Sequence, residues 1–143
     1  MTMIARLARY GLVCASVALL ATQSAANEEA DRAIRQRKWE AYAADIVAKY
    51  PAQKAYFIHN KTPRDQGLAD EVYSALRKSG KDAFLYDSFS AGDIAGIQEK
   101  DWRSVEQADV VFCGCTAPEA KAVRATVTKQ GFTGQFVALS EPK

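Results

Sequence analysis

Hydrophobic positions after residue 26 form two alternating patterns, spaced stripes and short unbroken runs. Within residues 27–50, four large side chains recur every three or four positions, which is the spacing of one helical face. They are Trp39, Tyr42, Ile46 and Tyr50. Pro51 ends this predicted helix, because proline lacks the N–H that a helix interior needs. The next run, residues 54–59, is short, apolar and rich in strand formers, and it predicts a buried strand.

The same alternation continues to the end of the chain. Helical stripes comprise Leu68, Val72, Ala75 and Leu76, then Ile94, Ile97, Trp102 and Val105, then Ala122, Val123 and Val127. Apolar runs at residues 83–86, 109–113 and 135–139 predict three further strands. Thr116 and Glu119 have the spacing of a capping box, in which each side chain satisfies a backbone N–H at the start of a helix. Each predicted strand after the first is therefore preceded by a predicted helix.

Continuously apolar strands separated by helices are typical of a parallel sheet that is covered on both faces. We expect a three-layer α/β fold with four parallel strands in the order 2-1-3-4 and the first helix packed beside the edge. Binding sites in such sheets lie at the carboxyl ends of the strands, near the point where the strand order reverses. The residues to search for chemistry are therefore 59–67, 87–93, 114–118 and those from 140 onward.

The first 26 residues have the pattern of a secretory signal peptide. Arg6 and Arg9 precede an apolar stretch at residues 11–21, and a small-residue end follows at residues 24–26. The apolar run is shorter than the roughly 20 residues that cross a bilayer. We expect a signal peptide at 1–26, cleavage near Ala26, export to a bacterial periplasm, and a single α/β domain at 27–143. The alternative is an uncleaved helix that anchors the chain to a membrane.

The charge balance bears on the choice of partner. The chain carries 19 basic and 17 acidic residues, for a net charge of +2. Arg6 and Arg9 in the predicted leader account for that excess, so the remaining chain is neutral. A neutral surface without a basic run gives no electrostatic reason to expect a nucleic acid as partner.

Candidate chemistry in the four loops is sparse. His59 is the only histidine, and two readings are open: pairing with a nucleophile such as Cys113 on a neighbouring strand, or capping and packing. Lys61 and Arg64 stand near a helix N-terminus, where they either hold an anion or are simply solvated. We expect no catalytic residues, no cofactor and no metal.

Cys113 and Cys115 flank a single glycine, and three interpretations are open. Cys113 packs as a small apolar residue, the pair forms a disulfide in an oxidising compartment, or the sulfurs serve a metal or redox function. Closing so short a ring predicts an easily reduced bridge. Two sulfurs and one histidine fall short of the four ligands that zinc prefers.

Five strings of the chain, in order and in register, carry a family resemblance. They are residues 57–61, 66–71, 87–93, 108–114 and 117–132. From about residue 41 to 138 the chain resembles the periplasmic leucine/isoleucine/valine-binding proteins of ABC transporters. The resemblance implies a type I substrate-binding protein, whose two α/β lobes close on an amino acid without catalysing a reaction. It also implies that this chain corresponds to the second lobe only.

The resemblance implies positions for ligand contacts. Aromatic contacts of the family in the first and third strand–helix loops fall on Arg64 and Thr116, so neither aromatic is kept. Glu141 lies near the position of the carboxylate that pairs with the ligand's ammonium, and Cys115 replaces a glycine. Arg64, Thr116 and Glu141, with His59 at the end of the first strand, form the candidate ligand-binding set.

These features lead to one function and three alternatives. The leading hypothesis is an exported, non-enzymatic single-lobe relative of branched-chain amino-acid-binding proteins. Its partners would be a branched-chain or other amino acid, an ABC permease, a separate first lobe, or a second copy. The alternatives are a truncated remnant without ligand, a redox or metal protein built on Cys113 and Cys115, and a Toll/interleukin-receptor-like domain in which Glu119 cleaves NAD.

Overall fold

The computed structural model describes residues 2–81 and 83–143, with the side chains of 2–16, 83 and 84 left out. The chain divides into two compact units, Met1–Arg37 and Lys38–Lys143. Helix α1, Thr2–Lys49, begins well before the predicted start at Asn27. The sequence prediction placed the start too late because it treated the alanine- and leucine-rich leader separately, although alanine and leucine are strong helix formers.

The second unit contains a sheet of four parallel strands. β1 is Ala55–Asn60, β2 is Ala83–Phe89, β3 is Val110–Gly114 and β4 is Gln135–Leu139. Their order is β2-β1-β3-β4, and every neighbouring pair is parallel. The predicted fold class, strand direction and strand order are confirmed. The strand order reverses beside β1, so the carboxyl ends of β1 and β3 are the expected place for a site.

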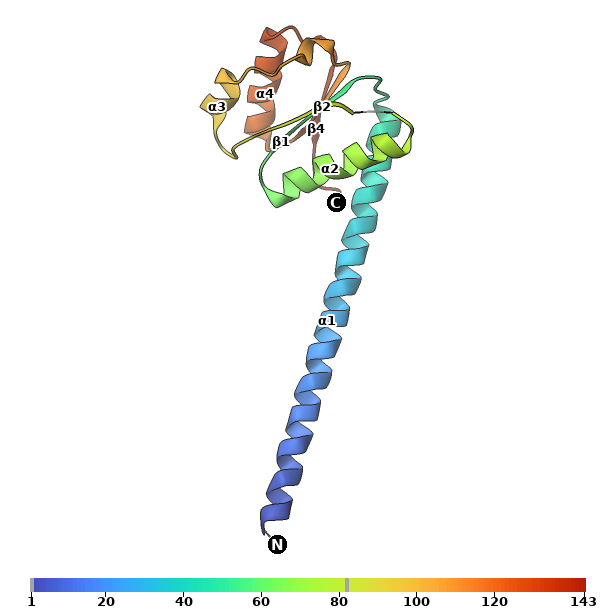
Figure 1. Ribbon diagram of the computed structural model, residues 1–143, viewed down its shortest axis with the longest axis vertical. Helices are drawn as coiled ribbons and strands as arrows, with labels where there is room; N and C mark the ends of the chain where they lie inside the picture. Colours follow the sequence, from blue (N-terminus) through green and yellow to red (C-terminus); the bar gives the residue numbers. More distant parts are fainter. Residues whose placement is uncertain (1, 82) are drawn as a thin grey trace. The chain divides into compact units, whose positions relative to one another are not determined.

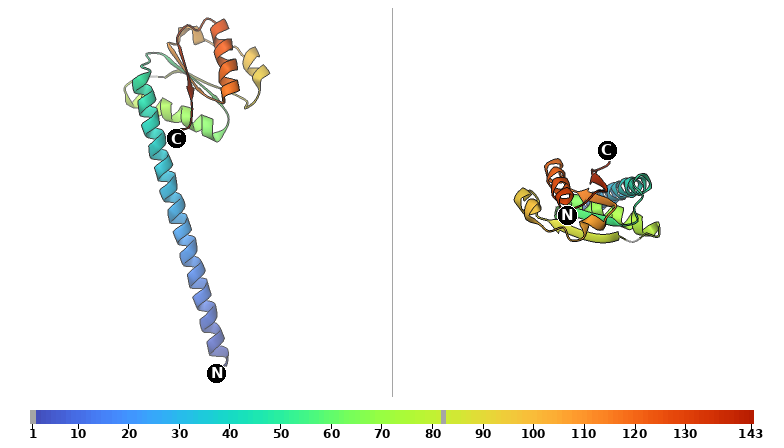
Figure 2. Two further views of the ribbon diagram at one scale, coloured as in Figure 1. Left: turned by 180° about the vertical axis from the view of Figure 1, so that it is seen from behind. Right: turned by 90° about the horizontal axis from the view of Figure 1, so that it is seen from above.

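Helices cover the sheet on both faces (Figures 1 and 2). α2, Pro63–Lys78, packs on one face with Phe57 and Phe112 of the central strands. α3, Ile94–Glu99, and α4, Ala117–Lys129, pack on the other face with Ile58 and Val111. Neighbouring residues of β1 thus point to opposite layers, as the period of a strand requires.

The predicted helix through Ile94, Ile97, Trp102 and Val105 is divided in two. α3 ends at Glu99, and a 3-10 turn, η1, follows at Val105–Gln107. Lys100 has an extended backbone. The Gln130 side chain supplies the hydrogen bonds that a continuing helix would have made to these backbone groups. Its Oε1 accepts from the Trp102 N–H at 2.8 Å, and its Nε2 donates to the Lys100 carbonyl at 2.8 Å. The apolar side chains nonetheless enter the core together.

Residues 38–49 of α1 belong to the second unit and pack on the same face as α2. The Tyr42 hydroxyl accepts a hydrogen bond from the N–H of Ser140, the residue after β4, at 3.1 Å. This helical segment therefore lies beside an edge strand, as predicted. Trp39 fits over Gly67 of α2, where an added Cβ would lie 2.7 Å from the Trp39 ring.

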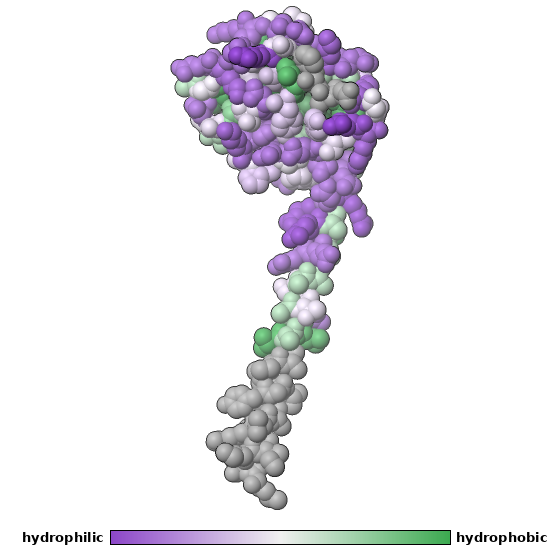
Figure 3. Space-filling model, in the orientation of Figure 1, coloured by the Kyte–Doolittle hydropathy of each residue, from purple (hydrophilic) through white to green (hydrophobic). Residues whose placement is uncertain are grey.

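The first unit is helical over its described residues. Its exposed side chains include Val17, Leu19 and Leu20, and Figure 3 shows hydrophobic residues exposed on α1. Within residues 2–81 and 83–143, no helix has both the length and the apolar character needed to span a membrane. The signal peptide and its cleavage near Ala26 stay predictions.

Candidate functional site

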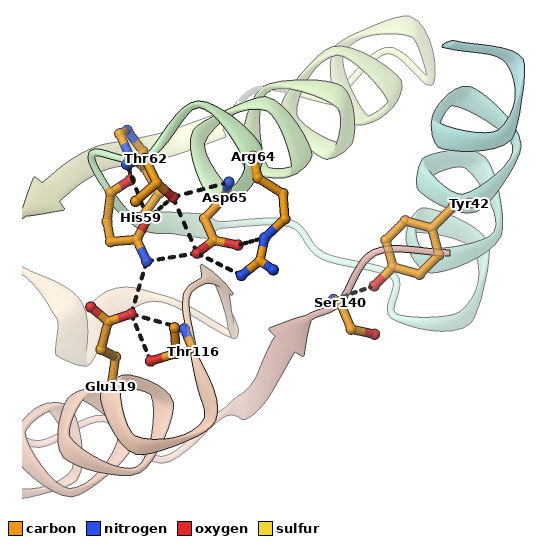
Figure 4. Close-up of polar contacts among 9 residues, drawn as sticks. Tyr42, His59, Thr62, Arg64, Asp65, Thr116, Glu119 and Ser140 are labelled. Carbon is orange, nitrogen blue, oxygen red and sulfur yellow. Dashed lines mark hydrogen bonds and ion pairs between the residues drawn. The ribbon is translucent and has the colours of Figure 1, made fainter. Parts of the chain in front are cut away.

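Asn60, the last residue of β1, is the centre of a buried polar network at the carboxyl end of the sheet. Figure 4 shows the two acids of this network, Asp65 and Glu119, on their separate helices. Asn60 is 1% exposed. The amide nitrogen donates to Asp65 Oδ2 at 2.6 Å and to Glu119 Oε1 at 2.8 Å. One amide group therefore joins two carboxylates that come from different helices.

The first turn of α2 supplies Asp65. Thr62 caps the helix, and its N–H donates to Asn60 Oδ1 at 3.1 Å while its hydroxyl accepts from the Asp65 N–H at 3.4 Å. Gly114 at the end of β3 lets this turn approach, because a Cβ there would lie 2.3 Å from the Asp65 carbonyl oxygen. The absence of a side chain at Gly114 therefore helps to place Asp65. This residue is 2% exposed.

The first turn of α4 supplies Glu119, and the predicted capping box is present. The Thr116 N–H and hydroxyl both donate to Glu119 Oε1, at 2.9 and 2.8 Å. The other oxygen, Oε2, accepts from the N–H of Gly92 at 2.9 Å. Glu119 therefore connects β1, α4 and the turn before α3.

These hydrogen bonds set the ionisation of Glu119. Burial disfavours the charged carboxylate and acts to raise its pKa. Donors from Gly92, Thr116 and Asn60 outweigh that effect, and they hold the pKa of the Glu119 carboxyl below its ordinary value. Glu119 is therefore a buried anion at neutral pH rather than a proton donor.

Arg64 places a positive charge at the rim. Its Nε donates to Asp65 Oδ1 at 3.0 Å, and the Arg64 side chain is 54% exposed whereas that of Asp65 is 3% exposed. The hydrogen bond from Arg64 to Asp65 raises the pKa of the guanidinium, and Glu141 adds a smaller effect in the same direction. Glu141 therefore shares the electrostatic environment of Arg64.

These groups line a cavity of about 540 Å³. Its lining residues come from the end of β1, from three of the four loops selected from the sequence and from the first turn of α4. They are Asn60, Thr62, Pro63, Arg64, Asp65, Ala91, Gly92, Thr116 and Glu119. Two members of the candidate ligand-binding set, Arg64 and Thr116, lie in this lining, whereas His59 and Glu141 are not part of it.

His59 lies on the other face of the sheet from Cys113. Its ring centroid is 5.1 Å from that of Tyr86, and its Nδ1 lies 2.6 Å from the Asn60 carbonyl oxygen. Cys113 is in register with Ile58 and shares the core on the α4 face. The pairing of His59 with Cys113 is therefore wrong: adjacent strands bring the backbones together, but alternation along β1 turns the imidazole away.

Cys113 and Cys115 form a disulfide, with their Cα atoms 5.6 Å apart. Of the three interpretations, the disulfide is the one that the structure contains, and both bridged residues are buried in the core on the α4 face. Across the described part of the chain, no group of three or more metal-ligating side chains is found.

Asn60, Asp65 and Gly92 are site residues that sequence reasoning missed. All three lie in loops selected from the sequence, 59–67 and 87–93, but the sequence analysis assigned them no role. A signal was present, because Thr62 and Asp65 at the start of α2 repeat the spacing of Thr116 and Glu119 at the start of α4. Two capping motifs at neighbouring strand ends place two carboxylates at one site.

In parallel α/β sheets, ligand sites commonly lie in a cavity at the carboxyl ends of the strands, which is where the cavity of this protein lies. No family model matches the chain. It is 34% identical to Leu/Ile/Val-binding protein homolog 2 of Brucella abortus, over 68% of this chain and 25% of that protein. It is 32% identical to an amino acid binding protein of Pseudomonas aeruginosa, over 65% of this chain and 25% of that protein.

A solved structure of a substrate-binding periplasmic protein from Ralstonia solanacearum has the same fold, with a TM-score of 0.53 and 15% identity over 75% of this chain and 30% of that one. The chain is a partial-length relative of the Leu/Ile/Val-binding proteins, as the resemblance implied. It spans about a quarter of the length of the curated relatives it matches.

Proposed function

We propose that this protein is an exported, non-catalytic ligand-binding lobe that takes a small amino-acid-like ligand in the cavity at the ends of β1 and β3. The observation that carries the proposal is the pair of buried carboxylates, Asp65 and Glu119, joined by Asn60 beside the exposed Arg64. The names of the relatives, Leu/Ile/Val-binding and amino acid binding proteins, support the ligand class.

The cavity offers a partner for each end of a zwitterion. A carboxylate oxygen accepts about two hydrogen bonds, and among the described residues Glu119 Oε2 accepts one, from Gly92. It therefore keeps capacity for an ammonium group. At the rim, Arg64 and the N-terminus of α2 favour a carboxylate. The site thus binds the ammonium and carboxylate groups of an amino acid, and these contacts do not involve the side chain of the ligand.

A single lobe contacts such a ligand from one side. Small-molecule sites usually bury most of the ligand's surface, so we expect weak binding by this chain alone. A separate first lobe, a permease subunit or a second copy would complete the enclosure. Docking of such a protein over the cavity is the second part of the proposal.

Isothermal titration of the full chain with leucine, isoleucine and valine tests the ligand. We expect heat of binding at millimolar ligand, and a loss of about tenfold in affinity for Glu119→Gln, because one charge-assisted hydrogen bond to the ammonium is lost. The matched control is Glu106→Gln, a charge-neutralising change at an exposed residue of η1. Absence of heat with all three amino acids would contradict ligand binding by the isolated lobe.

Glu119 is also the residue that a Toll/interleukin-receptor-like enzyme would use on NAD, and its position in the cavity makes this a second candidate. Against it, the carboxylate already bonds Thr116, Asn60 and Gly92. Incubating the full chain with NAD and measuring nicotinamide tests the candidate. We expect no nicotinamide release, and release that Glu119→Gln abolishes would establish the enzyme instead.

A further inference from the structure

We propose that the Cys113–Cys115 disulfide positions the turn between β3 and α4. Reduction of this disulfide by a dithiol would then make the residues that line the cavity more mobile. The bridge straddles this turn: Cys113 is the penultimate residue of β3, and Cys115 immediately precedes Thr116, the N-cap of α4. The effect on ligand affinity rests on the proposed function, whereas the effect on the turn does not.

The bridge spans a bend of the backbone at the strand end. Cys113 lies in β3 and Cys115 lies just beyond its last residue, and their Cα atoms are 5.6 Å apart. Cys113 is held in the sheet by its neighbours, in register with Ile58 and Ala138. The bond therefore fixes Cys115, and with it the start of α4, to a position set by the sheet.

The residue between the cysteines ties the same turn to α2. Gly114 is close to the Asp65 backbone, with no room for a Cβ. A shift of the bridged segment would therefore disturb Asp65 on one side and Thr116 on the other. These are the turns that present the two buried carboxylates.

The network beyond the bridge depends on the position of Thr116. The Thr116 N–H and hydroxyl hold Glu119 Oε1, and Glu119 Oε2 holds the Gly92 N–H. Gly92 lies in the cavity lining. The disulfide therefore acts on the site through Thr116 and Glu119, which makes the cysteines positioning residues rather than ligand contacts.

The redox step needs a dithiol reductant. One reductant thiolate attacks a sulfur of the bridge, which releases the other cysteine and forms a mixed disulfide. The second thiolate of the reductant then attacks the reductant's own sulfur in that mixed disulfide and releases the remaining cysteine. The protein gains two electrons and two protons and holds two thiols, while the reductant becomes a disulfide. Cys115 is 7% exposed and Cys113 is 0% exposed, so Cys115 is the more accessible of the two to the reductant.

Amide hydrogen exchange of the full chain, oxidised and then reduced with dithiothreitol, tests the effect on the turn. The Cys14→Ser background leaves two cysteines in the chain. We expect exchange at Gly92 and Thr116 to become at least tenfold faster on reduction, whereas Phe57 and Phe112 in the central strands stay unchanged. Reoxidation should restore the slow exchange.

Unchanged exchange at Gly92 and Thr116, or equal acceleration at all four amides, would overturn the proposal, because the bridge would then be inert or would act only on global stability. The double variant Cys113→Ala/Cys115→Ala gives a second measurement without reductant, and it should reproduce the reduced state.

Titration with leucine then tests the effect on the ligand. We expect the oxidised chain to bind at least fivefold more tightly than the reduced chain. Equal affinities would overturn the coupling to the site. If the oxidised chain binds no amino acid, the proposed function fails, but the exchange comparison still decides whether the disulfide positions the turn.

Discussion

The first turns of α2 and α4 are built from the same residue types but have different connections. Each begins with a threonine cap, contains a proline, and carries an acid three residues after the cap: Thr62 with Asp65, and Thr116 with Glu119. Both acids accept a hydrogen bond from the Asn60 amide nitrogen. The two turns thus form a pair of capped helix ends around one strand terminus.

The difference lies in where each acid makes its remaining contact. Asp65 is paired with Arg64, its neighbour in sequence, at the rim. Glu119, longer by one methylene, reaches the Gly92 N–H in a distant loop. The same type of helix cap therefore makes local contacts in α2 but connects separate segments of the chain in α4. This difference predicts that changes at the two turns have unequal effects.

Asn60→Ala should have the largest effect, because it breaks both turns at once. The change removes the donor shared by two buried carboxylates, and we expect it to lower the free energy of unfolding by about 3 kcal/mol. Urea denaturation of the full chain measures this loss. Gln66→Ala, at an exposed position of α2, is the control and should stay within about 0.5 kcal/mol of the parent. Equal losses for both variants would contradict a bridging role for Asn60.

Exchanging each acid for its amide should separate the two turns. Glu119→Gln places an NH₂ group against the Thr116 and Asn60 donors or the Gly92 donor, and we expect a loss of about 2 kcal/mol. Asp65→Asn turns its new NH₂ toward Arg64, which can swing into water, and we expect a loss of about 1 kcal/mol. The same denaturation assay ranks them. A larger loss for Asp65→Asn would reverse the comparison.

The pH dependence should sharpen the comparison with a smaller effect. The pKa of Glu119 is lower in the folded protein than its ordinary value of 4.5, so its contribution is fully present above that value and is lost as the pH falls through the folded pKa. Glu119→Gln removes this contribution. The variant should therefore lose less stability than the parent between about pH 5 and pH 3, as measured by denaturation at each pH. Parallel curves would show that Glu119 does not titrate differently on folding.

Most of the fold follows from patterns within single elements. Unbroken apolar runs and helical stripes gave the strand direction and order, and the capping box at Thr116 gave the start of α4. The division of the predicted helix after Glu99 was missed, because the side chain of Gln130 satisfies the backbone there. These contacts join residues 28 and 30 positions apart, and no local pattern predicts them.

The site was predicted less completely. The sequence selected the correct strand ends, and it placed Arg64 and Thr116 in the cavity lining. It favoured His59 over Asn60, since a single histidine draws attention to its chemistry. Alternation along β1 would have corrected this, because Asn60 shares the face of Ile58 while His59 shares that of Phe57. Hydrogen-bond partners such as Gly92 depend on the assembled loops and are not encoded in spacing.

The Trp39 ring packs against Gly67, where there is no room for a Cβ. Substitutions at these two positions are therefore mutually dependent, whether they arise by design or by evolution. An alanine at 67 would require a smaller ring at 39, while a smaller residue at 39 alone would leave an unfilled notch between the helices. Single steps in either direction are penalised, and only paired exchanges keep residues 38–49 docked in their present register on α2.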